Sequence, residues 1–360
     1  MSDKNRHKEI SLDYITLTQR KVFMGLLLII LLLLSSFYSI RVGSYHITVG
    51  KLFEILLEGK GDHVLNHVLW EIRLPRTFAA LIAGAGLGLA GAIMQNLLRN
   101  PLASPFTLGV SQGAAFGAAS AIILLGAGQT YRVGNEAVTI NSPYMVVIFA
   151  FLGSLVAVFS ILLLSVLRGI SPESLILAGV ALSSFFGAAT MLLQYFASDM
   201  QIAATVFWTF GDLGKAGWND NLLMLIVLVP SFVYFFYRSW SYNALEWGDE
   251  VAKSLGVNIK VLRILGMVIS SLVASVMIAF LGIIGFIGLI SPHVVRLIVG
   301  NDHRFLIPYS ALFGGFLLLL SDILARKVMA PVILPVGILT SFAGAPLFIY
   351  LLIKRRRIIE

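Results

Sequence analysis

The sequence predicts an all-α membrane protein with ten transmembrane helices. Of its 360 residues, 58% are hydrophobic and only 12% are charged, whereas about a quarter of a soluble domain is charged. Between Thr77 and Leu98 there is no Asp, Glu, Lys or Arg. Because a helix rises 1.5 Å per residue, about 20 such residues cross a hydrocarbon core of roughly 30 Å. The composition therefore favours a polytopic membrane protein over two soluble domains.

The first span is expected from Val22 to about Ile40, after a polar segment of residues 1–21. Its apolar core is longer than the h-region of a signal peptide, and no small-residue cleavage pattern follows it, so we expect an uncleaved span. Residues 41–72 mix charges with short apolar patches. We place this segment outside the membrane, either as a short interfacial helix or as a plain loop.

The second span, residues 77–98, is rich in glycine. Residues 86–91 form a GxGxxG pattern, but no strand or ribose-binding acid accompanies it, which argues against a dinucleotide site. Gly84, Gly88 and Ala92 recur every four residues instead, and this spacing lets the backbone of a second helix approach closely. We therefore assign these small residues to helix packing.

The other eight spans are identified in the same way, from apolar runs with few charges. They are expected at about residues 109–126, 144–167, 175–196, 222–237, 264–284, 286–299, 305–324 and 336–353. The outer segment 197–219 is expected to be partly helical, and the inner segment 238–260 is polar. The ten spans form one transmembrane domain, residues 22–354, followed by a short cytoplasmic tail, residues 355–360.

The basic residues predict the orientation of this layout. Of the 26 Lys and Arg residues, 17 lie on the side that holds both termini. Cytoplasmic segments of membrane proteins carry an excess of Lys and Arg, so we place both termini in the cytoplasm, with the chain in a plasma (inner) membrane. The net charge of +8 is then explained by orientation and by contact with anionic membrane lipid. No nucleic-acid partner is expected.

The sequence does not assemble the groups that catalysis needs. With no cysteine there can be no thiolate metal site and no cysteine nucleophile. His293 has no second histidine four residues on, so a zinc site is not expected. No GxxxxGK[ST] motif is present, and ATP binding through a P-loop is therefore excluded. We expect no enzyme activity, metal or cofactor in this chain; if transport is driven by ATP, the ATPase is another polypeptide.

Asp322 lies near the outer end of the ninth span. An acidic side chain inside a membrane is a candidate for proton relay or for pairing. The interpretation that we favour is a helix-end carboxylate paired with Arg326, four residues further on.

The inner segment contains a candidate docking element, LEWGDEVAKSLGV, at residues 245–257. Asp249 and Glu250 fall in the first turn of a predicted short amphipathic helix, where the helix dipole favours them. Gly256 is placed to end this helix. A capped helix between two spans can act as a rigid lever pressed by a cytoplasmic partner; an ordinary cytoplasmic loop is an equal alternative.

Long runs of the sequence resemble one known family. They are RLPRTFAALIAGAGLGLAGAIMQNLLRNPLASPFTLGVSQGA, GDEVAKSLGV, and GFIGLISPHVVRLIVGNDHRFLIPYSALFGGFLLLLSDILARKV followed by LPVGILTSFAGAPLFIYLL. They closely resemble the FecCD family, whose members are permease subunits of type II ABC importers for iron-siderophore complexes, haem and vitamin B12. The resemblance covers about residues 71–354.

This resemblance implies a type II ABC importer permease fold, like that of the vitamin B12 permease. It also implies a function: moving a metal chelate from a binding protein into the cytoplasm. The implied partners are a second permease copy in a homodimer, two ABC ATPase subunits that carry ATP and Mg, and an extracytoplasmic substrate-binding protein. An ion-coupled secondary transporter is the alternative, and it would need several acids or polar groups at mid-membrane.

The resemblance also implies roles for particular residues. Arg73, Arg76 and Arg326 match arginines that meet acidic lobes of the binding protein, and the guanidinium fork suits carboxylates; snorkelling helix-end charges are the alternative. ATPase coupling is implied for Gly248, Asp249, Glu250, Ala252, Leu255 and Gly256. The cytoplasmic gate is implied for Asn100, Pro101, Leu102, Ser171, Pro172 and Glu173. The match of the second set, residues 171–173, is loose, because Pro172 and Glu173 stand where small hydroxyl residues are usual in the B12 branch.

Overall fold

A computed structural model describes residues 3–43, 48, 50–51, 54–55, 63–127, 142–168 and 172–356. Every regular element within these residues is helical. The α-helices are α1 (Asp3–Arg41), α3 (His63–His67), α4 (Leu74–Leu97), α5 (Val110–Leu124), α6 (Pro143–Arg168), α7 (Pro172–Tyr195), α8 (Asp199–Thr209), α9 (Trp218–Tyr237), α10 (Ser239–Glu246), α11 (Asp249–Ser254), α12 (Ile259–Leu281), α13 (Ile287–Val299), α14 (His303–Lys327) and α15 (Val336–Arg356). A π-helix, Val68–Arg73, and two 3-10 helices, Pro105–Leu108 and Leu213–Lys215, complete the set.

Each of the ten segments expected to cross a membrane falls largely on a helix. Among the described residues, seven helical stretches are long and apolar enough to do so: Thr18–Arg41, His63–Leu97, Pro143–Leu164, Ser174–Tyr195, Trp218–Tyr237, Ile259–Leu281 and His303–Lys327. Three shorter apolar helices occupy the other expected positions: Val110–Leu124, Ile287–Val299 and Val336–Pro346. The chain is therefore an all-helical membrane protein with at least seven helices suited to spanning.

Polar side chains at the helix starts explain several of the boundaries. Ser198 accepts a hydrogen bond from the backbone of Gln201 at the start of α8, and Asn258 accepts one from Val261 at the start of α12. Asp302 caps α14 in the same way, through the Arg304 backbone N–H. Such caps satisfy backbone donors that a helix start leaves free. The expectation that residues 197–219 are partly helical is confirmed by α8 and a 3-10 turn.

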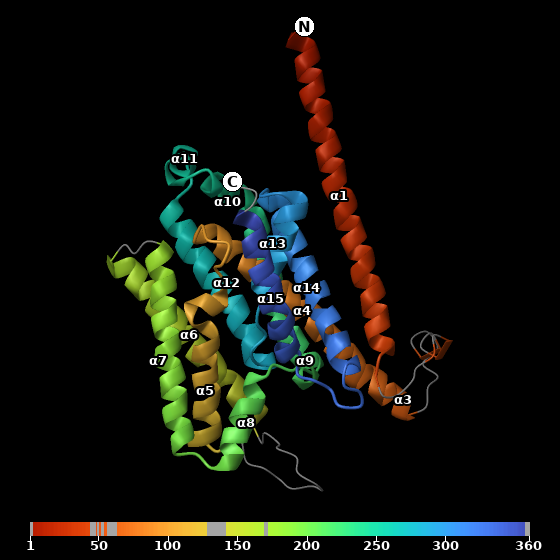
Figure 1. Ribbon diagram of the computed structural model, residues 1–360, viewed down its shortest axis with the longest axis vertical. Helices are drawn as coiled ribbons and strands as arrows, with labels where there is room; N and C mark the ends of the chain where they lie inside the picture. The colour runs from red at the N-terminus through yellow and green to blue at the C-terminus, as the bar shows by residue number, and fades with distance from the viewer. Residues whose placement is uncertain are drawn as a thin grey trace.

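The helix α4 lies at the centre of the fold and packs against α9, α12, α13 and α14 (Figure 1). A Cβ added at Gly84 would lie 2.3 Å from the Gly314 carbonyl oxygen, and one at Gly88 would lie 2.2 Å from that of Ser310. These glycines therefore let the α4 and α14 backbones approach more closely than any side chain would permit. The prediction that they serve helix packing is confirmed.

The helices α5, α6 and α7 form a second group at one side of α4 (Figure 1). A Cβ at Gly113 of α5 would lie 2.5 Å from the Gly153 carbonyl oxygen of α6. The helix α12 packs against both α4 and α6 and so joins the two groups.

The long helix α1 packs on the opposite side of the molecule, against α14 (Figure 1). Its side chains Phe23, Leu33 and Leu34 are each more than 60% exposed. Such a surface suits lipid, because hydrocarbon does not penalise exposed apolar side chains.

The structure changes the start of the second span. Most of the segment 41–62 lies outside the described residues, but from His63 onward the chain is helical and runs through the π-helix into α4. This extension carries Arg73 and Arg76, which are tolerated there because other parts of the chain contact their guanidinium groups.

The beginning of α1, the end of α15, α10 and α11 lie at one end of the molecule, and α3 and α8 lie at the other (Figure 1). We call these the inner and outer ends, as in the sequence-based layout.

Candidate functional site

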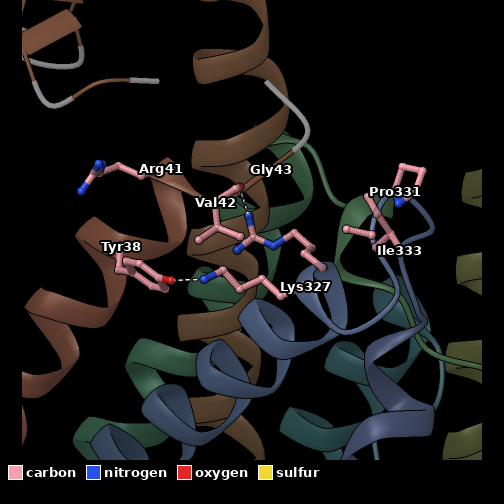
Figure 2. A pocket seen from close by; sticks show the side chains of 9 residues that line it. Tyr38, Arg41, Val42, Gly43, Lys327, Pro331 and Ile333 are labelled. Carbon is pink, nitrogen blue, oxygen red and sulfur yellow. Dashed lines mark hydrogen bonds between the residues drawn. The ribbon is translucent and has the colours of Figure 1, made fainter. Parts of the chain in front are cut away.

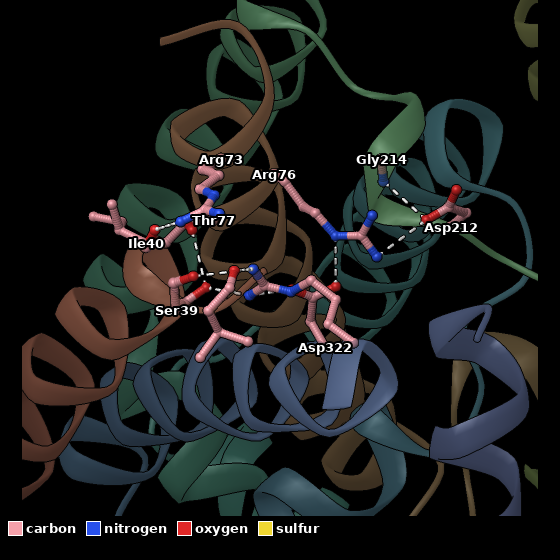
Figure 3. Close-up of polar contacts among 10 residues, drawn as sticks. Ser39, Ile40, Arg73, Arg76, Thr77, Asp212, Gly214 and Asp322 are labelled. Atoms are coloured by element: carbon pink, nitrogen blue, oxygen red, sulfur yellow. Dashed lines mark hydrogen bonds and ion pairs between the residues drawn. The ribbon is translucent and has the colours of Figure 1, made fainter. Parts of the chain in front are cut away.

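The three arginines assigned to docking lie together at the outer end, from three different helices. Figure 3 labels Arg73 and Arg76 near Asp322 and Ser39, and Arg326 contacts both Asp322 and Ser39. Arg73 ends the π-helix, Arg76 lies in the first turn of α4, and Arg326 lies in the last turn of α14. Their exposed fractions are only 5%, 7% and 8%. In this structure, the three side chains are therefore engaged within the chain.

Asp322 lies at the centre of this cluster and is completely buried. Its Oδ1 accepts a hydrogen bond from Arg76 Nε at 2.8 Å, and its Oδ2 forms an ion pair with Arg326 Nη2 at 2.9 Å. The predicted pairing of Asp322 with Arg326 is confirmed. Sequence reasoning missed the second partner, because Arg76 lies 246 residues away along the chain. A buried charge is tolerated only where it is paired.

Arg73 and Arg326 also bind the C-terminal end of α1. Arg326 Nη1 donates to the carbonyl oxygens of Ser39 at 3.0 Å and Val42 at 2.7 Å. Arg73 Nη1 donates to those of Ile40 at 2.9 Å and Arg41 at 3.1 Å. The last carbonyls of a helix have no partner within it and carry the negative end of the helix dipole, so cations stabilise them.

Arg76 extends the cluster to the segment between α8 and α9. Its Nη2 lies 3.4 Å from Asp212 Oδ1, and the Asp212 side chain is 38% exposed. Asp212 Oδ1 also accepts a hydrogen bond from Gly214 N at 2.9 Å and so caps the following 3-10 turn. The cluster thus connects five elements at the outer end: α1, the π-helix, α4, α14 and the segment between α8 and α9.

Two accessible cations at this end lie beside the three arginines. A pocket of about 580 Å³ opens between the outer ends of α1 and α14 (Figure 2). Lys327 is exposed, Arg41 is half-buried, and both line the pocket. The Lys327 ammonium donates a hydrogen bond to the Tyr38 hydroxyl. The outer cluster, defined as Arg41, Arg73, Arg76, Arg326 and Lys327 with Asp212 and Asp322, carries more positive than negative charge, which suits an anionic partner.

At the inner end, α11 has the limits that the sequence predicted. The helix Asp249–Ser254 follows Gly248, whose φ is +121°, and is closed by Gly256, whose φ is +80°. The backbone N–H groups of Gly256 and Val257 donate to Lys253 O and Ala252 O, both at 3.0 Å. Glycine takes a positive φ at little cost, which explains both positions. Ala252 is fully buried.

An exposed apolar patch lies on and around α11, beside the exposed polar side chains of Glu250, Lys253 and Ser254. Val251 is 43% exposed, Leu255 is 67% exposed, and Trp247, just before the helix, is 81% exposed. Val251 and Leu255 are four residues apart and so share one face. This end lies away from the expected membrane, so the patch is not explained by lipid and is typical of a protein contact.

The candidate gate residues Asn100, Pro101 and Leu102 form a tight turn after α4. Asn100 Oδ1 accepts a hydrogen bond from Leu102 N at 2.8 Å, which is an Asx turn. Leu102 is 36% exposed. Ser171 lies outside the described residues, as do the side chains of Pro172 and Glu173, although Pro172 begins α7.

The structure brings the gate turn and α11 together. Arg99, directly before the turn, forms an ion pair with Asp249 of α11, and Arg263 of α12 contacts the same carboxylate at 2.9 Å. Asn96 of α4 donates to Glu246 Oε2 at 3.0 Å. No local sequence pattern connects Asn96, Arg99, Glu246 and Arg263, so their contacts could not be predicted from the sequence.

Asp302 anchors the neighbouring turn between α13 and α14. Burial raises the pKa of its carboxyl, but hydrogen bonds from Arg304 and Asn243 outweigh burial and lower that pKa to about 2. Asp302 is therefore ionised at neutral pH. Asn243 of α10 donates to Asp302 Oδ1 at 2.9 Å. Its own Oδ1 accepts a hydrogen bond from the His303 backbone at 2.8 Å, so α10 is held against the start of α14.

Among the described residues, no three His, Asp or Glu side chains are grouped as a metal site. The outer end carries a cationic cluster, and the inner end carries an exposed apolar patch. Residues 29–354 match the sequence model of the FecCD transport family. The chain belongs to the FecCD transport family.

Relatives of this FecCD protein cover nearly its whole length. A Methanocaldococcus jannaschii protein named as an ABC transporter permease is 57% identical, over 96% of this chain and 98% of its own. The hemin transport permease HmuU of Yersinia pestis is 35% identical, and the vitamin B12 import permease BtuC of Salmonella paratyphi A is 38% identical; each match covers 94% of this chain and 97% of the relative.

A solved structure titled as an inward-facing conformation of a metal-chelate type ABC transporter has the same fold. It superposes with a TM-score of 0.79 at 32% identity, over 93% of this chain and 99% of its own. The FecCD protein is therefore an ABC transporter permease, a transport component rather than an enzyme.

Proposed function

We propose that this FecCD protein is the membrane subunit of an importer that moves a metal chelate into the cytoplasm. Iron-siderophore complexes, haem and cobalamin are the candidate substrates. The names of the hemin and vitamin B12 relatives and of the metal-chelate transporter support this class. In this proposal all ten apolar helices cross the membrane, both termini are cytoplasmic, and two copies pair around a central path.

The exposed apolar face of α11 is the observation that carries the proposal. A short helix capped by glycine at both ends presents Val251 and Leu255 outward, next to Trp247. We assign this face to an ABC ATPase subunit, and a dimer would hold two. ATP and Mg belong to those subunits, and the roles proposed for Gly248, Asp249, Glu250 and Ala252 are to shape and orient the helix.

At the outer end we assign the cationic cluster to an extracytoplasmic binding protein with acidic docking lobes. Arg73, Arg76 and Arg326 are engaged with Asp322 and with α1 carbonyls, so their contribution is mainly to fix the shape of the surface and its positive potential. Lys327 and Arg41 are the more accessible charges and would meet the carboxylates. In this proposal Lys327 and Arg41 therefore make the direct contacts that were first assigned to the three arginines.

The ion-coupled alternative needs several acids or polar groups at mid-membrane, and Asp322, near the end of its span, is the acid by which it could be tested. Both of its oxygens contact arginine side chains, and no observation in the described residues favours a coupling-ion site. The importer is the function that the chain supports best.

Co-purification of the tagged chain from mild detergent, after light crosslinking, tests both surfaces. An ATPase and a binding protein should accompany the unchanged chain. Leu255→Asp should reduce the recovered ATPase by at least about tenfold, or about 1.4 kcal/mol, as expected for a central apolar contact. The same variant should retain the binding protein.

Lys327→Glu combined with Arg41→Glu is the matched variant at the outer end. It should reduce the recovered binding protein and leave the ATPase in place, so each variant controls for misfolding of the other. An unchanged chain that never recovers an ATPase would contradict the importer. Normal recovery of both partners by both variants would show that the two surfaces are misassigned.

A further inference from the structure

The last turn of α4, together with Arg99 just after the helix, is a junction between the candidate gate and the segment that carries α11. Three side chains of this junction reach other elements. Gln95 Nε2 donates to Leu289 O at 3.2 Å, and Gln95 Oε1 accepts from Arg296 Nη1 at 3.1 Å, both on α13. Asn96 and Arg99 reach α10 and α11. The gate turn, residues 100–102, begins at the next residue.

Arg99 makes the most direct of these contacts. Its φ of +45° is unusual for a residue other than glycine. In this conformation its guanidinium Nη2 donates to Leu245 O at 3.3 Å and pairs with the Asp249 carboxylate. Asp249 is the first residue of α11, so one side chain spans from the gate turn to the start of the docking helix.

A second contact runs parallel to the first. Asn96, which is only 5% exposed, donates from Nδ2 to Tyr242 O at 3.3 Å and to Glu246 Oε2 at 3.0 Å. Glu246 Oε1 accepts from Asn301 Nδ2 at 2.9 Å, in the turn between α13 and α14. Glu246 ends α10 and Asp249 begins α11, so the two contacts hold the junction between these helices from both sides.

We propose that these contacts form a linkage through which displacement of α11 moves the gate turn of the same chain. The linkage consists of Arg99 with Asp249 and Asn96 with Glu246. This inference rests on the proposed function, in which an ATPase presses on α11. The Arg99 and Asp249 side chains are 44% and 42% exposed, and exposed ion pairs contribute little to stability. Their removal should therefore spare the fold and reveal any role in transmission.

The simpler reading is that Arg99 only stabilises the C-terminal end of α4, as basic residues often do. The two readings differ when charges are exchanged. A helix-end role requires a basic residue at position 99 whatever lies opposite. A linkage requires opposite charges at positions 99 and 249, and it is restored when both are reversed.

The natural lack of cysteine allows a direct measurement at the gate. Leu102→Cys, in the complex with its co-purified ATPase in lipid nanodiscs, is modified with a maleimide in the presence and absence of ATP and Mg. We expect nucleotide to change the modification rate by at least about fivefold, the lower end for coupled sites. Adding Arg99→Glu should reduce this change to less than about twofold. Because Arg263 contacts the same carboxylate, adding both Asp249→Arg and Arg263→Glu to that variant reverses all three charges and should restore the change.

Three comparisons make the outcome decisive. Lys260→Glu, the same charge change at an exposed residue near the start of α12, should keep the full nucleotide effect. Glu246→Gln preserves the shape of the side chain and should weaken the nucleotide effect. If the Arg99→Glu complex fails to assemble, Glu246→Gln serves as the test variant in its place. ATPase recovery and basal ATP hydrolysis should be unchanged in the Arg99→Glu and Lys260→Glu variants.

The linkage is overturned if Arg99→Glu keeps the full nucleotide effect, or if reversing the charges at positions 99, 249 and 263 together restores none of it. Two other results would contradict the proposed function itself. In the first, no ATPase is recovered with the chain; in the second, nucleotide does not change the modification rate of the Leu102→Cys variant. Failure of the linkage and failure of the importer are therefore distinguishable.

Discussion

At the scale of single residues, the outer cluster shows how a membrane protein keeps several arginines out of water. One buried carboxylate, Asp322, contacts two guanidinium groups, and the carbonyl oxygens at the end of α1 receive other guanidinium donors. Part of this arrangement could be predicted. Arg326 lies one helical turn from Asp322, and that spacing alone brings their side chains together. The contact with Arg76 depends on how α4 and α14 pack.

Replacing Asp322 with Asn should be strongly destabilising. The change leaves Arg76 and Arg326 without their shared charge partner, and breaking a buried ion pair from one side costs about 3–5 kcal/mol. Reversible unfolding in mixed detergent micelles would measure the loss. Asp212→Asn serves as the control, because the Asp212 side chain is 38% exposed and lies 3.4 Å from Arg76; it should cost less than about 1 kcal/mol. Equal stability of the two variants would contradict a central role for Asp322.

At the scale of helices, close backbone contact determines how α4 sits among its neighbours. The regular spacing of Gly84 and Gly88 predicted a packing face. It could not identify α14 as the helix that packs there, because any helix with small residues fits such a face. The structure shows that the partner also offers a glycine, Gly314, at the crossing.

Gly88→Ala tests this crossing with the smallest possible change. The added Cβ would lie 2.2 Å from the Ser310 carbonyl oxygen, so one backbone must move, and overpacking of this kind typically costs about 1–3 kcal/mol. Gly187→Ala on α7 is the control, since a Cβ there has no heavy atom within 4 Å. It should be neutral or stabilising by up to about 1 kcal/mol. The same unfolding titration should separate the two variants, and a neutral Gly88→Ala would mean that the α4 and α14 contact is looser.

At the scale of the whole molecule, the two ends differ in chemistry. The inner end carries the apolar face of α11, and the outer end carries the cationic cluster around Lys327. The distribution of Lys and Arg along the sequence already predicted which end faces the cytoplasm, because basic residues of short loops are retained on that side. The two surfaces become visible only when residues from several helices are placed together.

Single cysteines would test the orientation directly. We expect Asp199→Cys, at the start of α8, to react with a membrane-impermeant maleimide in intact cells. Lys260→Cys, near the start of α12, should react only after the membrane is permeabilised. Both side chains are exposed, so accessibility alone does not distinguish them. The reverse pattern, or labelling of both in intact cells, would contradict cytoplasmic termini.

The sequence by itself determined the elements whose cause is local. Apolar runs located the helices, glycines and first-turn acids gave the limits of α11, and helical spacing paired Asp322 with Arg326. Tertiary structure alone decided which side chains are accessible and which distant residues meet. In the tertiary structure Arg73, Arg76 and Arg326 are buried, and Arg99 contacts Asp249, a residue 150 positions away. Such contacts depend on helix packing, and hydropathy and spacing along one helix carry no information about which other helix lies opposite.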